Sequence, residues 1–94
     1  MAPPISQFRG KWRASWNDNG SLVNLYLTIN SDGSGEIRME EFSMGVTKTL
    51  FRERADFEIE GNGLYGYFPD GQVSHFIIDG NELTTEQGDT FYRE

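Results

Sequence analysis

The sequence predicts an all-β fold, a small antiparallel up-and-down meander that closes into a barrel of about eight strands. Three observations support this prediction. Clusters of Gly, Asn and Asp recur along the chain, and such clusters are typical of tight turns. The segments between them are about five to eight residues long, the length of strands and too short for most helices. Apolar and polar residues alternate in several segments, which is typical of strands with one buried face.

The strand segments follow one another between regular turn signals. In chain order, the first strand carries residues 10–12, alternating segments follow at 24–29, 37–40, 55–60 and 64–68, and the last strand ends at 91–93. Turn signals lie at residues 17–20, 30–35, 61–63, 69–71, 79–81 and 87–89. A meander of this length is most stable when it closes, because closure removes the edge strands that invite aggregation.

Two parts of the chain depart from this pattern. Residues 42–46 show neither clean alternation nor a turn signal, and residues 47–54 fit either a strand or a short helix. Two prolines near the N-terminus remove backbone donors, so residues 1–7 are expected to be a frayed segment. Residues 8–94 are expected to form a single domain, since a domain typically takes about 100–200 residues.

Composition and spacing argue against several classes of function. The net charge of −7 makes nucleic acid an unexpected partner, because phosphate binding needs clustered Lys and Arg. Without Cys the chain has neither a disulfide nor a thiolate metal site, and no apolar run approaches the ~20 residues of a membrane span. Ser74 and His75 are adjacent in a strand and face opposite ways, so they form no nucleophile–base pair and no enzyme is expected. We find no signal peptide, and the compartment and the oligomeric state are left open.

The two ends of the chain carry a recognisable pair of motifs. Gly10-Lys11-Trp12 near the start and Arg93 near the end resemble the pattern of the lipocalins and the wider calycin superfamily. In that superfamily the Trp seals one end of the barrel, and a late basic residue lies across its ring. The resemblance therefore implies that Gly10, Trp12 and Arg93 close the barrel.

Three later segments extend the resemblance over most of the chain. Residues 59–64 and 78–84 are similar to hairpins of small bacterial lipocalin-like domains, and residues 88–93 are similar to their last strand. Such domains are often exported. The resemblance implies a non-enzymatic protein that holds a small apolar or amphipathic ligand at one barrel end. The short chain keeps a second hypothesis open, a protein-binding module or inhibitor whose barrel is filled by its own side chains.

We place the binding region where the alternation breaks down, because sequence rules tend to fail at functional sites. Methionine in this stretch adapts its shape to varied partners, and the two tyrosines of residues 64–68 share one face of their strand. The predicted ligand- or partner-binding residues are Phe42, Met44, Val46, Leu50, Phe51, Tyr65 and Tyr67.

Residues 30–41 also fit the calcium-binding loop of EF-hands at several positions. Asn30, Asp32 and Ser34 would supply oxygen ligands, and Glu41 would be the bidentate acid. The alternating flanks favour a hairpin turn over the helices that such a loop requires. Calcium binding here is therefore a distant alternative, and no cofactor is expected.

Overall fold

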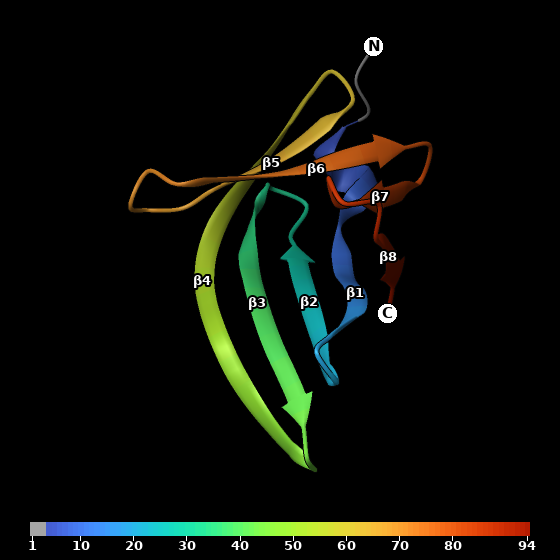
Figure 1. Cartoon of the computed structure of the whole chain (residues 1–94). Helices are drawn as coiled ribbons and strands as arrows, with labels where there is room; N and C mark the ends of the chain where they lie inside the picture. The colour runs from blue at the N-terminus through green and yellow to red at the C-terminus, as the bar shows by residue number, and fades with distance from the viewer. Residues whose placement is uncertain (1–3) are drawn as a thin grey trace.

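The computed structural model describes residues 4–94, which form one short 3₁₀ helix, η1 (Ile5–Phe8), and eight strands (Figure 1). The strands are β1 (Gly10–Asp18), β2 (Ser21–Ile29), β3 (Ser34–Ser43), β4 (Val46–Glu60), β5 (Gly63–Tyr67), β6 (Val73–Asp79), β7 (Glu82–Thr84) and β8 (Thr90–Arg93). Over residues 4–94 no helix has the length and hydropathy needed to cross a membrane.

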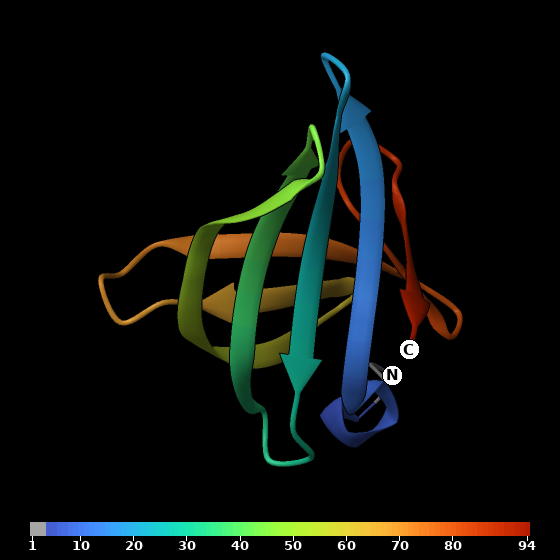
Figure 2. The same ribbon diagram turned by 90° about the horizontal axis from the view of Figure 1, so that it is seen from below.

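Consecutive strands pair antiparallel, and β8 returns to pair with β1, so the sheet closes into a barrel. The closing seam is short, with Trp12 opposite Arg93 and Arg13 opposite Tyr92. Figure 2 shows that the β5–β6 hairpin crosses the direction of β1, β2 and β3, while β4 bends from one direction into the other. The predicted all-β class, the meander and its closure are confirmed.

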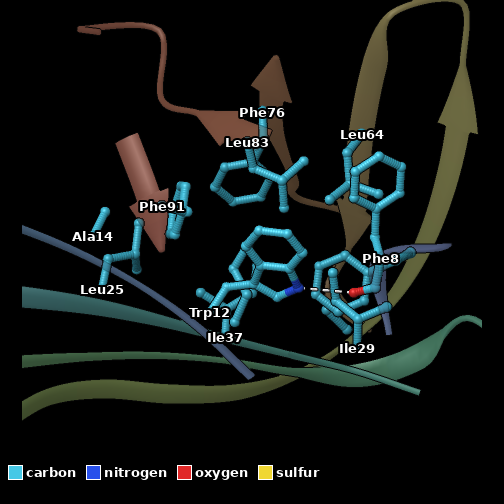
Figure 3. Close-up of a cluster of buried hydrophobic side chains, with 13 residues drawn as sticks. Phe8, Trp12, Ala14, Leu25, Ile29, Ile37, Leu64, Phe76, Leu83 and Phe91 are labelled. Atoms are coloured by element: carbon cyan, nitrogen blue, oxygen red, sulfur yellow. Dashed lines mark hydrogen bonds between the residues drawn. The ribbon is translucent and has the colours of Figure 1, made fainter. Parts of the chain in front are cut away.

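The core lies inside the barrel and draws on every element of the fold (Figure 3). In β2 every second residue from Val23 to Ile29 is buried, which is the alternation that the sequence shows. The buried cluster consists of Phe8, Trp12, Ala14, Leu25, Leu27, Ile29, Ile37, Ala55, Phe57, Leu64, Phe76, Leu83 and Phe91. Removal of this apolar surface from water is the main force that closes the barrel.

The helix η1 closes one end of the barrel. Phe8 is fully buried, and Trp12 Nε1 donates a hydrogen bond to the Phe8 carbonyl oxygen at 2.8 Å (Figure 3). Ile5 packs against the same core. The sequence predicted a frayed segment over residues 1–7, but Ile5–Phe8 forms this helix because its apolar side chains can be buried. Residues 1–3 lie outside the described part of the chain.

Arg93 joins the last strand to this closed end. Its Cζ lies 4.2 Å from the centroid of the Trp12 ring, a contact that contributes roughly 0.5–2 kcal/mol. Its Nη2 donates to the Gln7 carbonyl oxygen at 2.9 Å, and its Nη1 donates to the Arg9 carbonyl oxygen. A Cβ atom at Gly10 would lie 3.3 Å from Arg93 Nη1, so the glycine leaves room for the guanidinium. The contact expected between Trp12 and Arg93 is present.

Residues 42–54 form a regular hairpin rather than an irregular stretch. Ser43 pairs with Val46, and the two residues between them, Met44 and Gly45, have φ angles of 53° and 77°. Two consecutive positive φ angles are typical of the type I′ turn of two-residue hairpins. Residues 47–54 belong to β4, so the strand and not the helix is the correct alternative. The turn at Met44 and Gly45 could not be predicted from the sequence, because Met seldom adopts a positive φ.

β4 is longer than its partner on one side. It pairs with β3 along most of its length, but β5 pairs only with its last part, from Asp56 to Glu60. Between Val46 and Ala55 the outer edge of β4 therefore has no strand partner within residues 4–94. The β3–β4 hairpin thus extends beyond β5, at the end of the barrel opposite η1 (Figure 2).

Candidate functional site

A pocket of about 500 Å³ opens on the inner face of the barrel, away from η1. Trp12 and Leu27 face each other near the closed end, and Leu25, Met39 and Phe51 lie further along the same sheet and line the pocket. β2, β3 and β4 contribute one wall. The other wall comes from residues 68 and 72–76 and from the loop that joins β7 to β8. The pocket therefore lies where the two halves of the barrel cross.

The floor of the pocket is apolar. It is made by Leu25, Ile37, Met39, Phe51, Phe68 and Phe76. A bulge in β4 shapes this wall, because the register with β3 shifts between Met39 and Glu40 and leaves Leu50 as an extra residue. After the bulge Phe51 lies opposite Met39, with its ring partly buried against the core.

The rim of the pocket is polar. It is made by Gln72, Ser74, His75, Thr85, Glu86 and Gln87, with the exposed Val73 as its one apolar member. Ser74 occupies an inward position on β6, two residues before the buried Phe76. A hydroxyl at a position that normally carries an apolar side chain places a hydrogen-bonding group inside the barrel mouth.

Backbone hydrogen bonds hold the loop at residues 85–89 in place. Thr85 is buried, its N–H donates to the Asp89 carbonyl oxygen at 2.8 Å, and Asp89 N–H donates to Thr85 Oγ1 at 3.1 Å. Gly88 N–H donates to the Thr85 carbonyl oxygen at 3.0 Å. The loop is thus a closed turn that presents Glu86 and Gln87 at the pocket rim.

His75 connects the pocket rim to the outer face of the barrel. Its Nδ1 lies 3.0 Å from Glu86 Oε1, and because a carboxylate only accepts, Nδ1 is the nitrogen that donates. The imidazole also stacks on the Tyr65 ring, with centroids 4.7 Å apart and an interplanar angle of 11°. Gly63 permits this stack, because a Cβ atom there would lie 2.9 Å from His75 Nε2.

The structure does not bring the predicted binding residues into one site. Phe51 lines the pocket, and Leu50 stands beside it in the bulge. Phe42, Met44 and Val46 do not line the pocket, since they lie at the tip of the β3–β4 hairpin with their side chains in water. Met44 is 97% exposed.

Tyr65 and Tyr67 lie on the outer face of β5, away from this hairpin tip. They pair with Glu58 and Asp56 near the far end of β4, and their rings stack with centroids 6.4 Å apart. Partial desolvation of the Tyr67 phenol and the nearby Glu58 and Glu60 carboxylates raise the pKa of Tyr67. The expectation that both tyrosines join residues 42–51 at one barrel end is corrected, because β4 bends between them.

The weak calcium candidates are also separated. Asn30, Asp32 and Ser34 meet in the β2–β3 turn, where Asp32 Oδ1 accepts from the Ser34 hydroxyl at 2.7 Å and Asn30 Nδ2 donates to Ser34 Oγ at 3.0 Å. Glu41 lies seven residues further along β3, opposite Val23, which at strand spacing is roughly 23 Å away. The segment is a hairpin turn, and its side chains bond to one another.

The pocket contains residues that the sequence did not mark. Leu25, Ile37 and Phe76 alternate as ordinary core residues, so nothing distinguishes them before the fold is known. Ser74 does carry a signal, because it is polar at an inward position. Glu86 and Gln87 lie in a turn segment, and only the crossing of the two halves brings them to the pocket.

No known protein was found to match this chain. Comparisons with protein-family models, with curated proteins and with solved structures gave no match to this chain. What can be said of its class is therefore what the structure shows, a closed eight-stranded antiparallel β-barrel that is compatible with a lipocalin-like barrel.

Proposed function

We propose that the protein is a non-enzymatic binding protein that holds a small apolar or amphipathic ligand in the open end of the barrel. The pocket of about 500 Å³ carries the proposal. Sites for small molecules typically measure about 300–1,000 Å³ and combine apolar walls with a few polar groups. Phe51, Phe68 and Phe76 supply such walls, and Ser74 and Gln72 supply polar groups at the mouth.

One end of the barrel is covered and the other is open, and this difference supports a ligand-binding role. One end is covered by η1, Trp12 and Arg93, and the pocket opens at the other, where a ligand would enter. Ser74 and His75 face opposite sides of β6, so these two side chains do not act together as nucleophile and base.

A neutral fluorescent dye, Nile red, tests the proposal. We expect saturable binding of one dye per chain, with a rise in fluorescence as the dye enters an apolar site. Ser74→Trp should abolish this binding because the indole fills the pocket, whereas Ser15→Trp on the outer face of β1 should leave it unchanged. Native mass spectrometry after mild purification should show a small molecule bound to the wild-type chain. Dye binding that is absent in the wild type, or equal in both variants, would refute the proposal.

A second candidate function is a protein-binding role for the hairpin tip. Five large apolar side chains are exposed around it: Leu22, Phe42, Met44, Val46 and Leu50. Leu22 lies opposite Phe42 across β2 and β3, so these two side chains adjoin. Exposed apolar patches on small proteins often mark interaction sites.

Paired variants separate this second candidate from ligand binding. Phe42→Ser should remove proteins that co-purify with the wild type, while Nile red binding persists, because Phe42 does not line the pocket. Tyr92→Ser serves as the control, since Tyr92 is another exposed aromatic residue that lies on β8. Equal recovery of co-purifying proteins with both variants would exclude the tip as their binding site.

A further inference from the structure

The charges around the open end define the class of ligand more narrowly. We propose that the pocket takes an amphiphile with a cationic head, such as an alkylamine or an alkylammonium, and discriminates against the carboxylate of the same chain length. This inference rests on the proposed function, because it concerns the same pocket. It follows from the placement of the acidic and basic side chains over the two faces of the sheet.

Three carboxylates surround the open end of the barrel. Glu86 lines the pocket at its rim, where it bonds to the outward-facing His75. The strand register places Glu53 opposite the buried Ile37 and Glu41 opposite the buried Val23, and residues that face each other across antiparallel strands lie on the same side of the sheet. Both carboxylates therefore lie on the inner face of β3 and β4, toward the mouth.

The basic side chains lie almost entirely elsewhere. The chain has eight Lys and Arg residues. The register places Lys11, Arg13, Arg38, Arg52 and Arg54 on the outer face of β1, β3 and β4. Arg9 and Arg93 lie at the closed end, where Arg93 donates to the Arg9 carbonyl oxygen. The register of residues 4–94 places two basic side chains on the inner face, Arg93 opposite Trp12 at the closed end and Lys48 opposite Glu41 toward the mouth.

Glu86 is positioned to receive a cationic head. His75 binds only Oε1 of this carboxylate, at 3.0 Å, and a carboxylate accepts further hydrogen bonds at its other oxygen. The Glu86 side chain is 63% exposed, so a head group can reach it from the mouth. The rings of Phe51 and Phe68 line the same pocket, and aromatic faces attract ammonium groups.

The electrostatic surroundings of the pocket are unfavourable for a ligand with a carboxylate head. At the rim it would lie beside Glu86, and the one basic residue that lines this pocket in the described chain, His75, is already bonded to Glu86. Like charges brought together near an apolar wall repel. The net charge of −7 adds to the discrimination, because it concentrates cations and depletes anions around the protein.

Three decyl probes that differ only in the head group test the inference. Isothermal titration calorimetry below the micelle concentration compares decylammonium, decyl maltoside and decanoate at neutral pH. We expect decylammonium to bind at least about tenfold more tightly than decanoate, and added salt to reduce this ratio. Equal affinities, or tighter binding of decanoate, would overturn the charge inference and leave the proposed function standing. Failure of all three probes to bind would instead refute the proposed function.

Matched variants locate the preference in the pocket. Glu86→Gln should reduce the decylammonium-to-decanoate affinity ratio severalfold while leaving decyl maltoside binding unchanged, and Glu53→Gln should act in the same direction. Glu58→Gln removes the same charge from the outer face, opposite Tyr65, and should leave the ratio unchanged. If Glu58→Gln lowers the ratio as much as Glu86→Gln, the preference comes from the net charge alone and the assignment to Glu86 is wrong.

Discussion

Trp12 connects three parts of the chain through one side chain. Trp12 is 2% exposed, its Nε1 donates to the carbonyl oxygen of Phe8, and the guanidinium of Arg93 covers the face of its ring. The helix, the first strand and the last strand therefore depend on the same indole. Loss of this side chain removes apolar burial, a buried hydrogen bond and a cation–π contact together.

We expect Trp12→Ala to lower the free energy of unfolding by about 3–5 kcal/mol, as large-to-small changes in a core do. Trp12→Phe keeps most of the apolar volume but leaves the Phe8 carbonyl oxygen without its donor, at a cost of about 1–3 kcal/mol. Urea denaturation followed by circular dichroism measures both values without depending on the Trp signal. Equal values for the two variants would show that the indole N–H, and not the ring volume, carries the effect.

Asp32 gives a pH-dependent prediction at the same scale. The Ser34 hydroxyl and the Ser34 N–H both donate to its carboxylate and hold the pKa of Asp32 below its ordinary value. A carboxylate with a lowered folded pKa stabilises the fold above its unfolded pKa of about 3.9, and this contribution is lost as the pH falls through the folded pKa. We expect Asp32→Ala to lower the Tm near about pH 7, and the difference to shrink near about pH 3. An equal difference in Tm at both pH values would contradict this.

At the scale of elements, the β3–β4 hairpin combines an unfavourable turn residue with exposed apolar side chains. Met44 has a φ of 53° and no burial that would offset it. Asn and Gly are the residues that this kind of turn favours. Residues that oppose the local backbone preference are more common at functional sites, so Met44 supports the proposed protein-binding role of the hairpin tip.

We expect Met44→Asn to stabilise the protein by about 0.5–1 kcal/mol, because Asn adopts positive φ more readily and no buried surface is lost. Gly45→Ala should destabilise it, since its φ of 77° disfavours a Cβ atom. Thermal denaturation measures both changes. A loss of stability in Met44→Asn would mean that the Met44 side chain packs within the fold.

Most strands could be predicted from the sequence, but the β3–β4 hairpin could not, because its turn and its bulge interrupt the alternation. Alternation identifies β2 because one face of it is buried along its whole length. In β4 the extra residue Leu50 shifts the alternation, so Lys48 and Phe51 share the inner face at a spacing of three. The pocket depends on how β6 crosses β3, which is a long-range contact that no local pattern records.

For the whole molecule, the two halves of the barrel differ in how firmly they are joined. β1 to β4 pair over long registers, whereas β7 has three residues, and β8 pairs with only Trp12 and Arg13 of β1. The side chain of Arg93 therefore stabilises the seam, through a cation–π contact with Trp12 and hydrogen bonds to the backbone before β1. The seam and the β7–β8 pair, with two residue pairs each, are the parts of the barrel with the least paired backbone.

We expect amide hydrogen exchange to be slowest in β2 and β3 and fastest in β7 and β8, because opening the short seam breaks few hydrogen bonds. Arg93→Ala should speed exchange in β8 and η1 and leave β2 unchanged. Mass spectrometry of peptides after exchange measures this order. Uniform exchange across all strands would show that the barrel opens only by global unfolding.

The unpartnered edge of β4 has a consequence for how the protein behaves at high concentration. An open strand edge is a template on which further chains can add and grow into fibrils. Lys48, Arg52 and Arg54 stand along this edge, and another chain would have to strip water from their charged ends before its backbone could dock. We therefore expect these three cations to disfavour edge-to-edge association of barrels along β4 at high concentration.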